Sequence, residues 1–270
     1  MAEAPGSARI AAAFAAARAE RRAALMPYMM AGYPGPETAL SIGRAYADAG
    51  ADLIEVGVPF SDPLADGPVI HAAATDALSA GATLEDALAV VAELDEGVPA
   101  VLMCYANMIL ALGPKRFAGR LDNAGAAGAI VPDLPLEESA EFREALAERG
   151  LALVPLVAPT TPPERRRRIS ESADGFVYVV SDVGTTGERA SVPQRLTELV
   201  EAVKGESSVP VAVGFGISTP EQAAEVGRVA DGVIIGSRLV RLVAEADSGP
   251  AAADRVSSFL HETRAALGAG

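Results

Sequence analysis

The feature that most constrains the fold is a regular alternation between short apolar runs and segments with helical periodicity. The apolar runs are rich in Val, Ile, Leu and Ala, and each is short, which is typical of strands buried on both faces. Eight such runs are present, at 26–31, 52–58, 100–106, 129–134, 152–157, 175–180, 209–214 and 232–235.

A segment with helical periodicity follows each apolar run, at 38–50, 84–94, 117–125, 137–149, 163–172, 194–203, 221–229 and 254–267. Glycines at 50, 125 and 150 close three of these segments, as is common at helix C-termini. An additional helix is predicted at 7–22, before the first run, with Ile10, Phe14 and Ala17 on one face.

Strict alternation of strands and helices requires parallel strands joined by crossover helices. Eight units of about 30 residues without a longer crossover favour a closed (β/α)8 TIM barrel over an open doubly wound sheet. The sequence shows no linker or low-complexity segment, so residues 1–270 are predicted to form a single α/β barrel domain with an extra N-terminal helix. In such barrels the active site lies at the carboxyl ends of the strands.

Composition excludes several classes of protein. A net charge of −14 disfavours binding to nucleic acid phosphates. The single cysteine, Cys104, lies in an apolar run, so we expect a core residue rather than a disulfide or a thiolate metal site. The sequence shows neither a signal peptide nor an uncharged apolar stretch of about 18 residues. We therefore expect a cytoplasmic protein with no membrane span.

One acidic residue interrupts the second apolar run. Side chains alternate across a strand, so Glu55 shares a face with Leu53 and Gly57, opposite the branched residues at 54, 56 and 58. The branched residues should pack under the helices, which directs Glu55 into the barrel. Burying an unpaired carboxylate costs several kcal/mol and should raise its pKa. Glu55 is therefore a candidate general acid–base, the alternative being a structural Glu paired with a buried Lys or Arg.

The segment that follows, at 59–68, is long for a loop between a strand and a helix, and it carries three prolines and two aspartates. Long loops in compact domains are often functional, and prolines help to hold a single shape. Asp62 and Asp66 are each compatible with an ordinary turn residue. A loop of this length can also fold over the barrel mouth and bring Asp66 opposite Glu55.

Glycine-rich loops follow the last three apolar runs. The loops after the seventh and eighth runs contain Gly216 and the pair Gly236-Ser237, where barrels of this kind commonly bind a phosphate on backbone amides. The loop after the sixth run has Thr186 next to Gly187, which suggests a lid that hinges on glycines. The alternatives are simple turns for the first two loops and a flexible surface loop for the third.

The segment 54–68, which reads IEVGVPFSDPLADGP, resembles the signature of the tryptophan synthase alpha subunit family. Blocks at 30–34, 103–107, 131–135, 184–187 and 213–217 also resemble the family in the family's order, so the likeness covers essentially the whole chain. The resemblance implies a lyase of tryptophan biosynthesis. Such an enzyme cleaves indole-3-glycerol phosphate to indole and glyceraldehyde 3-phosphate in a retro-aldol reaction.

Roles for the two carboxylates follow from the resemblance. Glu55 is expected to protonate C3 of the indole ring and to take the proton from the glycerol hydroxyl. Asp66 is expected to hold the indole N–H and to stabilise the positive charge of the tautomerised ring. The carbon–carbon bond breaks only once C3 is sp3, and the resemblance implies no metal and no organic cofactor in this chain.

The resemblance also implies how the substrate is held. The expected walls of the indole pocket are Tyr28, Met103, Tyr105, Ile130, Val157 and Tyr178. The expected phosphate-binding residues are Gly187, Phe215, Gly216, Gly236 and Ser237, with Thr186 in the lid. For most of the pocket residues, ordinary barrel packing is the alternative.

A partner is implied as well. The family works as an α2β2 complex with a beta subunit that carries pyridoxal phosphate, and the loop around Asp62 and the region 105–107 would face it. Three alternatives stay open: another phosphate-binding barrel enzyme such as an isomerase, a stand-alone lyase, and an allosteric subunit with almost no activity of its own.

Overall fold

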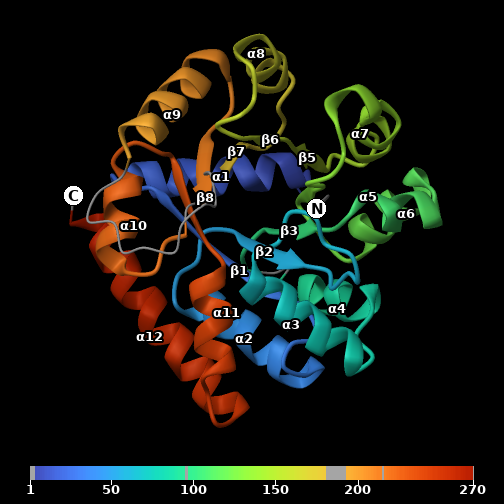
Figure 1. Ribbon diagram of the computed structural model, residues 1–270, viewed down its shortest axis with the longest axis vertical. Coiled ribbons are helices and arrows are strands. Elements are labelled where there is room, and N and C mark those ends of the chain that lie inside the picture. The colour runs from blue at the N-terminus through green and yellow to red at the C-terminus, as the bar shows by residue number, and fades with distance from the viewer. Residues whose placement is uncertain (1–3, 95–96, 181–192, 215, 270) are drawn as a thin grey trace.

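The computed structural model describes residues 4–94, 97–180, 193–214 and 216–269. In these residues, nine strands form one sheet in which every neighbouring pair is parallel, and helices surround it (Figure 1). The strands are β1 Ala24–Met30, β2 Ile54–Gly57, β3 Ala100–Met103, β4 Gly128–Ile130, β5 Ala152–Val154, β6 Leu156–Val157, β7 Val177–Val180, β8 Val211–Gly214 and β9 Gly232–Ile235.

The sheet closes at a single residue. The strand order is β5-β4-β3-β2-β1-β9-β8-β7-β6, and its two end strands are separated in the chain only by Pro155. Because proline has no N–H to donate, the strand predicted at 152–157 is divided into two short strands. The first pairs with β4 and the second with β7. The predicted parallel barrel is therefore confirmed, with one strand split in two.

Side-chain alternation divides the core into an inner cluster inside the barrel and an outer cluster beneath the helices. Ile54 and Val56 belong to the outer cluster. Leu53 belongs to the inner cluster, together with Met26. The alternation predicted for β2 is thereby confirmed, and it directs Glu55 to the inner side.

The helices of the described residues are α1 Gly6–Ala19, α2 Pro36–Asp48, α3 Pro68–Ser79, α4 Leu84–Leu94, α5 Ala106–Leu112, α6 Pro114–Asn123, the 3-10 turn η1 Leu136–Glu138, α7 Ala140–Ala147, α8 Pro163–Glu171, α9 Gln194–Glu206, α10 Pro220–Gly227, α11 Ser237–Ala244 and α12 Gly249–Gly268. The sequence did not predict α3, α5 and α11. Helix α3 buries only small side chains, Ala73, Ala74 and Ala77, so it has no periodic pattern of large apolar residues. Within the described ranges, no helix is long and apolar enough to span a membrane.

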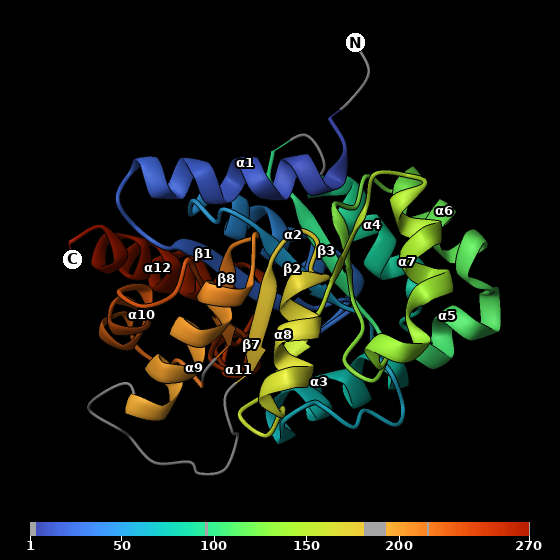
Figure 2. The same cartoon turned by 90° about the horizontal axis from the view of Figure 1, so that it is seen from above.

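Helix α1 lies across one end of the strands (Figure 2). Ile10, Phe14 and Ala17 are at most 3% exposed and join the inner cluster, which confirms the face predicted for this helix. The rings of Phe14 and Phe176 lie 5.7 Å apart. The helix ends at Ala19 rather than at residue 22. It therefore acts as a plug for the N-terminal end of the barrel.

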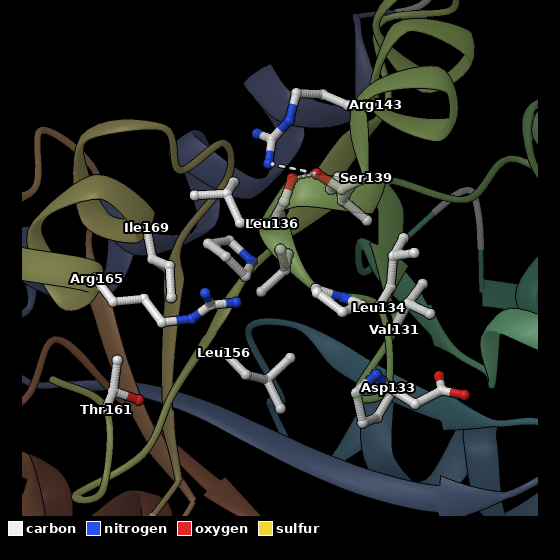
Figure 3. A pocket seen from close by; sticks show the side chains of 15 residues that line it. Val131, Asp133, Leu134, Leu136, Ser139, Arg143, Leu156, Thr161, Arg165 and Ile169 are labelled. Atoms are coloured by element: carbon white, nitrogen blue, oxygen red, sulfur yellow. Dashed lines mark hydrogen bonds between the residues drawn. The ribbon is translucent and has the colours of Figure 1, made fainter.

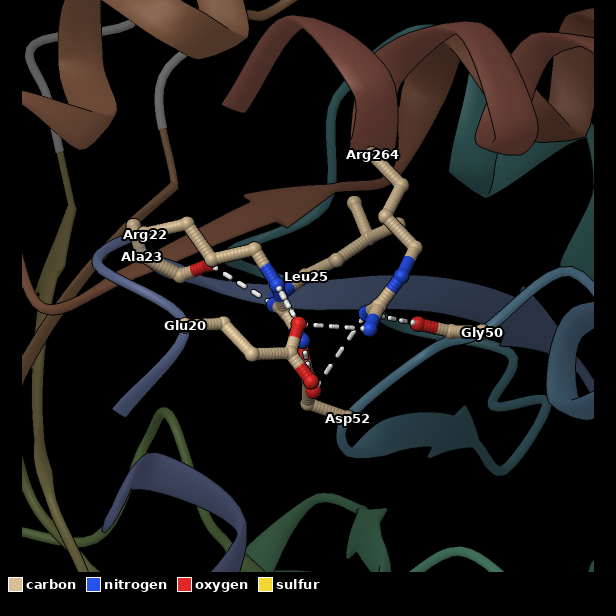
Figure 4. Close-up of polar contacts among 7 residues, drawn as sticks. All are labelled: Glu20, Arg22, Ala23, Leu25, Gly50, Asp52 and Arg264. Atoms are coloured by element: carbon tan, nitrogen blue, oxygen red, sulfur yellow. Dashed lines mark hydrogen bonds and ion pairs between the residues drawn. The ribbon is translucent and has the colours of Figure 1, made fainter. Parts of the chain in front are cut away.

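A charged network joins α1 to α12 at this end of the barrel (Figure 4). Arg22 donates to both carboxylate oxygens of Asp52, at 2.5 and 2.8 Å, and Asp52 also accepts the amide of Leu25 at 2.7 Å. Glu20 accepts from Arg22 and from Arg264 of α12, each at 2.8 Å. The Arg22 side chain is only 3% exposed, so the network links the first and last helices through a buried ion pair.

Candidate functional site

Glu55 lies in β2, between Tyr28 on β1 and Val101 on β3, and it is 1% exposed. In the described part of the chain, neither of its carboxylate oxygens has a hydrogen-bond partner. Burial and, to a lesser degree, the charge of Asp66 raise the Glu55 pKa to about 8. No buried Lys or Arg of the described residues pairs with it, so the structural alternative is not found there. A carboxyl group with this pKa can hold or release a proton near neutral pH.

Asp66 lies in the loop between β2 and α3 and is partly buried. Burial raises its pKa, while a hydrogen bond from the Tyr105 hydroxyl and the charge of His71 act in the opposite direction. The charge of Asp66 in turn raises the Glu55 pKa. The carboxyl group of Asp66 therefore lies close enough to Glu55 for its charge to influence the protonation of Glu55.

Tyr105 holds this loop in place. Its hydroxyl accepts the amide of Ala65 at 3.1 Å, and its ring stacks on Phe60 with 5.1 Å between centroids. Tyr105 itself is 3% exposed and directly precedes α5. The segment that carries Asp66 is thus held by a residue that lies just beyond β3, the strand next to the one that carries Glu55.

Two further tyrosines point into the mouth of the barrel, each packed over a glycine. The ring of Tyr28 occupies the space that a side chain on Gly57 would need. The hydroxyl of Tyr178 lies 2.6 Å from the position that a Cβ on Gly214 would take. Burial, followed by the charges of the two carboxyl groups, raises the pKa of both tyrosines well above the usual value. The structure therefore gathers three tyrosine rings around the carboxyl pair.

The other predicted wall residues of the indole pocket do not all face the inside of the barrel. Met103 and Ile130 are neighbours in register and pack with the inner cluster, Ile130 being fully buried. Val157 instead packs in the outer cluster, and Leu156, the register partner of Tyr178, faces inward. Alternation continues through Pro155: Ala152, Val154 and Leu156 pack inward, and Leu153 and Val157 pack outward. Val157, which only the family resemblance placed in the pocket wall, therefore does not face the barrel interior.

The described residues of the predicted phosphate-binding set, Gly216, Gly236 and Ser237, lie at the ends of β8 and β9. Gly216 follows β8 and is exposed, and no atom lies within 4 Å of the position that a Cβ on it would take. Gly236 precedes α11, and Ser237 is its first residue. The N-terminal amides of this helix have no partner within it and favour an anion. Thr186, Gly187 and Phe215 lie outside the described residues.

A separate cavity of about 360 Å³ lies between the loop after β4 and helix α8 (Figure 3). Leu134, Leu136 and Leu156 contribute to its apolar wall. At its edge, Arg143 donates to Ser139 at 3.4 Å. The cavity contains neither carboxyl group of the candidate site, and it occurs where the sheet closes at Pro155.

Sequence reasoning missed three contributors to the site. His71 lies only five positions after Asp66, but the Ala-rich α3 that carries it has no periodic pattern of large apolar residues that would direct it toward the site. The stacking of Phe60 on Tyr105 joins segments 45 positions apart and has no local signal. The inward position of Leu156 did have a signal, since Leu156 follows the same alternation as Ala152 and Val154 in the predicted strand 152–157. No group of three or more side chains able to hold a metal occurs in the described ranges.

Comparison with known proteins decides the family. A family model described as tryptophan synthase alpha chain matches residues 14–267. The tryptophan synthase alpha chain of Prochlorococcus marinus (strain MIT 9313) is 47% identical over 97% of this chain and 96% of its own length. The chain belongs to the tryptophan synthase alpha family.

Other similarities agree with membership of the tryptophan synthase alpha family. A solved structure of Mycobacterium tuberculosis tryptophan synthase superimposes with a TM-score of 0.90 and 40% identity, over 97% of this chain and 99% of that chain. Saccharomyces cerevisiae tryptophan synthase is 48% identical over 87% of this chain, but only 34% of its own length is covered. The chain is thus a lyase of tryptophan biosynthesis, and cleavage of indole-3-glycerol phosphate is the reaction of this family.

Proposed function

We propose that Glu55 is the general acid–base of the retro-aldol cleavage. In its neutral form it donates a proton to C3 of the indole ring, which makes C3 sp3 and leaves a positive charge on the ring nitrogen. The resulting carboxylate then removes the proton of the adjacent glycerol hydroxyl. The carbon–carbon bonding pair returns to the ring as the aldehyde forms, so Glu55 ends the cycle protonated. The raised pKa of about 8 supports this double role.

Asp66 is proposed to hold the indole N–H and to offset the positive charge that appears when C3 is protonated. Its partly buried carboxylate is fixed by the Tyr105 hydroxyl, and the charge of His71 favours its ionised form. The two acids therefore have unequal surroundings, since the Glu55 carboxyl group has no hydrogen-bond partner in the described residues while Asp66 has the Tyr105 hydroxyl, and such a difference suits an acid and an electrostatic partner. The observation that carries the proposal is this unequal pair at the carboxyl end of β2.

The ring of the substrate is proposed to lie among Tyr28, Met103, Tyr105 and Tyr178, above the buried floor at Ile130. Its phosphate is proposed to bind at Gly216, Gly236 and Ser237, where the amino end of α11 offers backbone amides. The lid predicted at Thr186, together with Gly187 and Phe215, is proposed to complete this end of the site. Strand β1 lies between β2, which carries Glu55, and β9, which precedes α11, so one strand separates the two proposed ends of the substrate site.

We further propose that a beta subunit binds in an α2β2 complex and carries the pyridoxal phosphate. Two large hydrophobic side chains of the described residues are strongly exposed, Leu64 at 87% and Leu110 at 72%. Leu64 lies in the loop that Tyr105 holds, and Leu110 lies in α5, which begins directly after Tyr105. These two residues, with Asp62, define the proposed partner surface, and Leu110→Asp should weaken complex formation with a beta subunit in gel filtration.

Placement of the pyridoxal phosphate in the partner has support from the lysines of this chain. Lys115 lies in α6 and Lys204 in α9, where Lys204 pairs with Asp231 at 2.9 Å. Neither lies at the carboxyl end of a strand, where a lysine that binds pyridoxal phosphate as a Schiff base would be expected. We also propose that the enzyme works in the cytoplasm, where a free, buried thiol such as that of Cys104 stays reduced.

The deciding experiment is an indole-release assay with indole-3-glycerol phosphate, with and without a tryptophan synthase beta subunit. Release that rises strongly with the partner is the expected result. High release without the partner would instead indicate a stand-alone lyase. Absence of indole under both conditions would overturn the proposed reaction.

A further inference from the structure

The side chain of Tyr28 spans the two ends of the proposed substrate site. Tyr28 lies beside Glu55 in register, and Gly57 lies two residues further toward the barrel mouth. The Cζ and Cε2 atoms of Tyr28 lie 2.7 and 2.8 Å from the position that a Cβ on Gly57 would take, and the hydroxyl lies closer still. The ring therefore leans toward the mouth, and its hydroxyl lies above the level of Glu55.

The other edge of the same side chain faces the proposed phosphate site. Its Cβ and Cδ1 atoms lie 3.6 Å from the position that a Cβ on Gly236 would take. Gly236 directly precedes α11, at whose amino end the phosphate is proposed to bind. Tyr28 thus lies between the carboxyl pair and the phosphate site, next to the part of the substrate that connects the indole ring to the phosphate.

The Tyr28 hydroxyl lacks a hydrogen-bond partner among the residues that the structure describes. Tyr28 is 3% exposed, and its backbone carbonyl, not its hydroxyl, accepts the hydrogen bond from Tyr46 at 3.2 Å. Burial and the charges of Asp66 and Glu55 raise the Tyr28 pKa well above the usual value, so the hydroxyl keeps its proton. The Tyr28 hydroxyl does not belong to the fully buried unpaired atoms of the described residues, so it keeps some accessible surface, where a ligand oxygen can become its partner.

We propose that the Tyr28 hydroxyl positions the substrate by a hydrogen bond to a hydroxyl of its glycerol chain. This inference rests on the proposed function, which places the indole ring at the carboxyl pair and the phosphate at α11. Between those ends, the polar groups of the substrate are the glycerol hydroxyls. A phenylalanine at this position would give the same apolar wall, so the hydroxyl adds recognition of the chain and orients it for proton removal by Glu55.

The test compares two ligands that differ only in the glycerol hydroxyls: indole-3-glycerol phosphate and indole-3-propanol phosphate. Dissociation constants are measured by calorimetry in the Glu55→Gln background, where turnover is blocked, with and without Tyr28→Phe. The Tyr28→Phe change should weaken binding of indole-3-glycerol phosphate by roughly 2- to 10-fold, the range for one neutral hydrogen bond. Binding of indole-3-propanol phosphate should stay the same.

Tyr46→Phe is the matched control, because it removes an equally buried hydroxyl from the opposite side of β1. It should leave the ratio of the two dissociation constants unchanged. Equal weakening of both ligands by Tyr28→Phe, or no weakening of either, would overturn the inference. A further result would also overturn it: Tyr28→Phe leaves the ratio of the two dissociation constants unchanged but, in enzyme that retains Glu55, shifts the pH–rate profile. The hydroxyl would then act on Glu55 and not on the substrate. Rapid turnover by Glu55→Gln would refute the proposed role of Glu55, which is a different outcome from failure of the inference about Tyr28.

Discussion

Replacing Glu55 with Gln is expected to change how stability depends on pH. The carboxyl group is 1% exposed and has no hydrogen-bond partner in the described residues. Its pKa is raised from 4.5 to about 8. Between these values the folded protein holds a proton that the unfolded chain has released. The free energy of unfolding of the native sequence therefore falls as pH rises through this window.

The magnitude follows from the width of the window. Each pKa unit corresponds to about 1.4 kcal/mol, so the whole window corresponds to about 5 kcal/mol. Gln cannot ionise, so the free energy of unfolding of Glu55→Gln does not fall with pH for this reason. The stability of Glu55→Gln relative to the native sequence should grow by about 1.4 kcal/mol per pH unit between about pH 5 and about pH 8. Below about pH 4.5 the difference should become constant, because Glu55 is then neutral in both states.

Urea unfolding followed by far-ultraviolet circular dichroism measures this difference, since the chain has no tryptophan to report by fluorescence. Glu93→Gln is a suitable control: Arg44 lowers the pKa of this carboxyl group, so its effect on stability should be constant between about pH 5 and about pH 8 and should change, with the opposite sign, only below about pH 4.5. A stability difference for Glu55→Gln that does not vary between about pH 5 and about pH 8 would refute the reasoning.

Three other changes test separate parts of the structure. Asp66→Asn should lower turnover by at least about 10²-fold in the indole-release assay while circular dichroism stays native, and near-normal turnover would argue against its role. Gly214→Ala places a methyl group 2.6 Å from the Tyr178 hydroxyl and should lower kcat/KM by roughly 10- to 100-fold; unchanged kinetics would mean that Tyr178 does not need this position. Arg22→Gln leaves the Asp52 carboxylate without its main partner and should lower the free energy of unfolding by roughly 2–4 kcal/mol in urea, with KM unchanged.

Much of the fold could be predicted because its signals are local. Short apolar runs marked the strands. The glycines at 50, 125 and 150, which were predicted to close three helices, all have a positive φ. The break at Pro155 was visible as a proline but depends on which neighbours each half of the strand finds, a long-range property. Helix α3 was missed because alanine burial gives almost no periodic signal.

The site was predictable to different degrees for the two acids. The inward direction of Glu55 follows from alternation along one strand, which a sequence shows directly. The position of Asp66 depends on a loop held by Tyr105, nearly forty residues away, so only the family resemblance indicated it. Alternation along the predicted strand 152–157 already directs Val157 outward, so its place in the pocket wall came from the resemblance alone and the structure does not support it.

The Arg22–Asp52 network and the α1 plug lie at the amino ends of the strands, whereas the carboxyl pair lies at their carboxyl ends. Ion pairing and apolar packing at the closed end can therefore be exchanged during evolution without altering the groups that meet the substrate. A lineage that adapts to a hotter habitat can change one end of this barrel and inherit the other intact. The same separation gives an engineer a place to add stability without the loss of activity that usually accompanies changes near a strained active site.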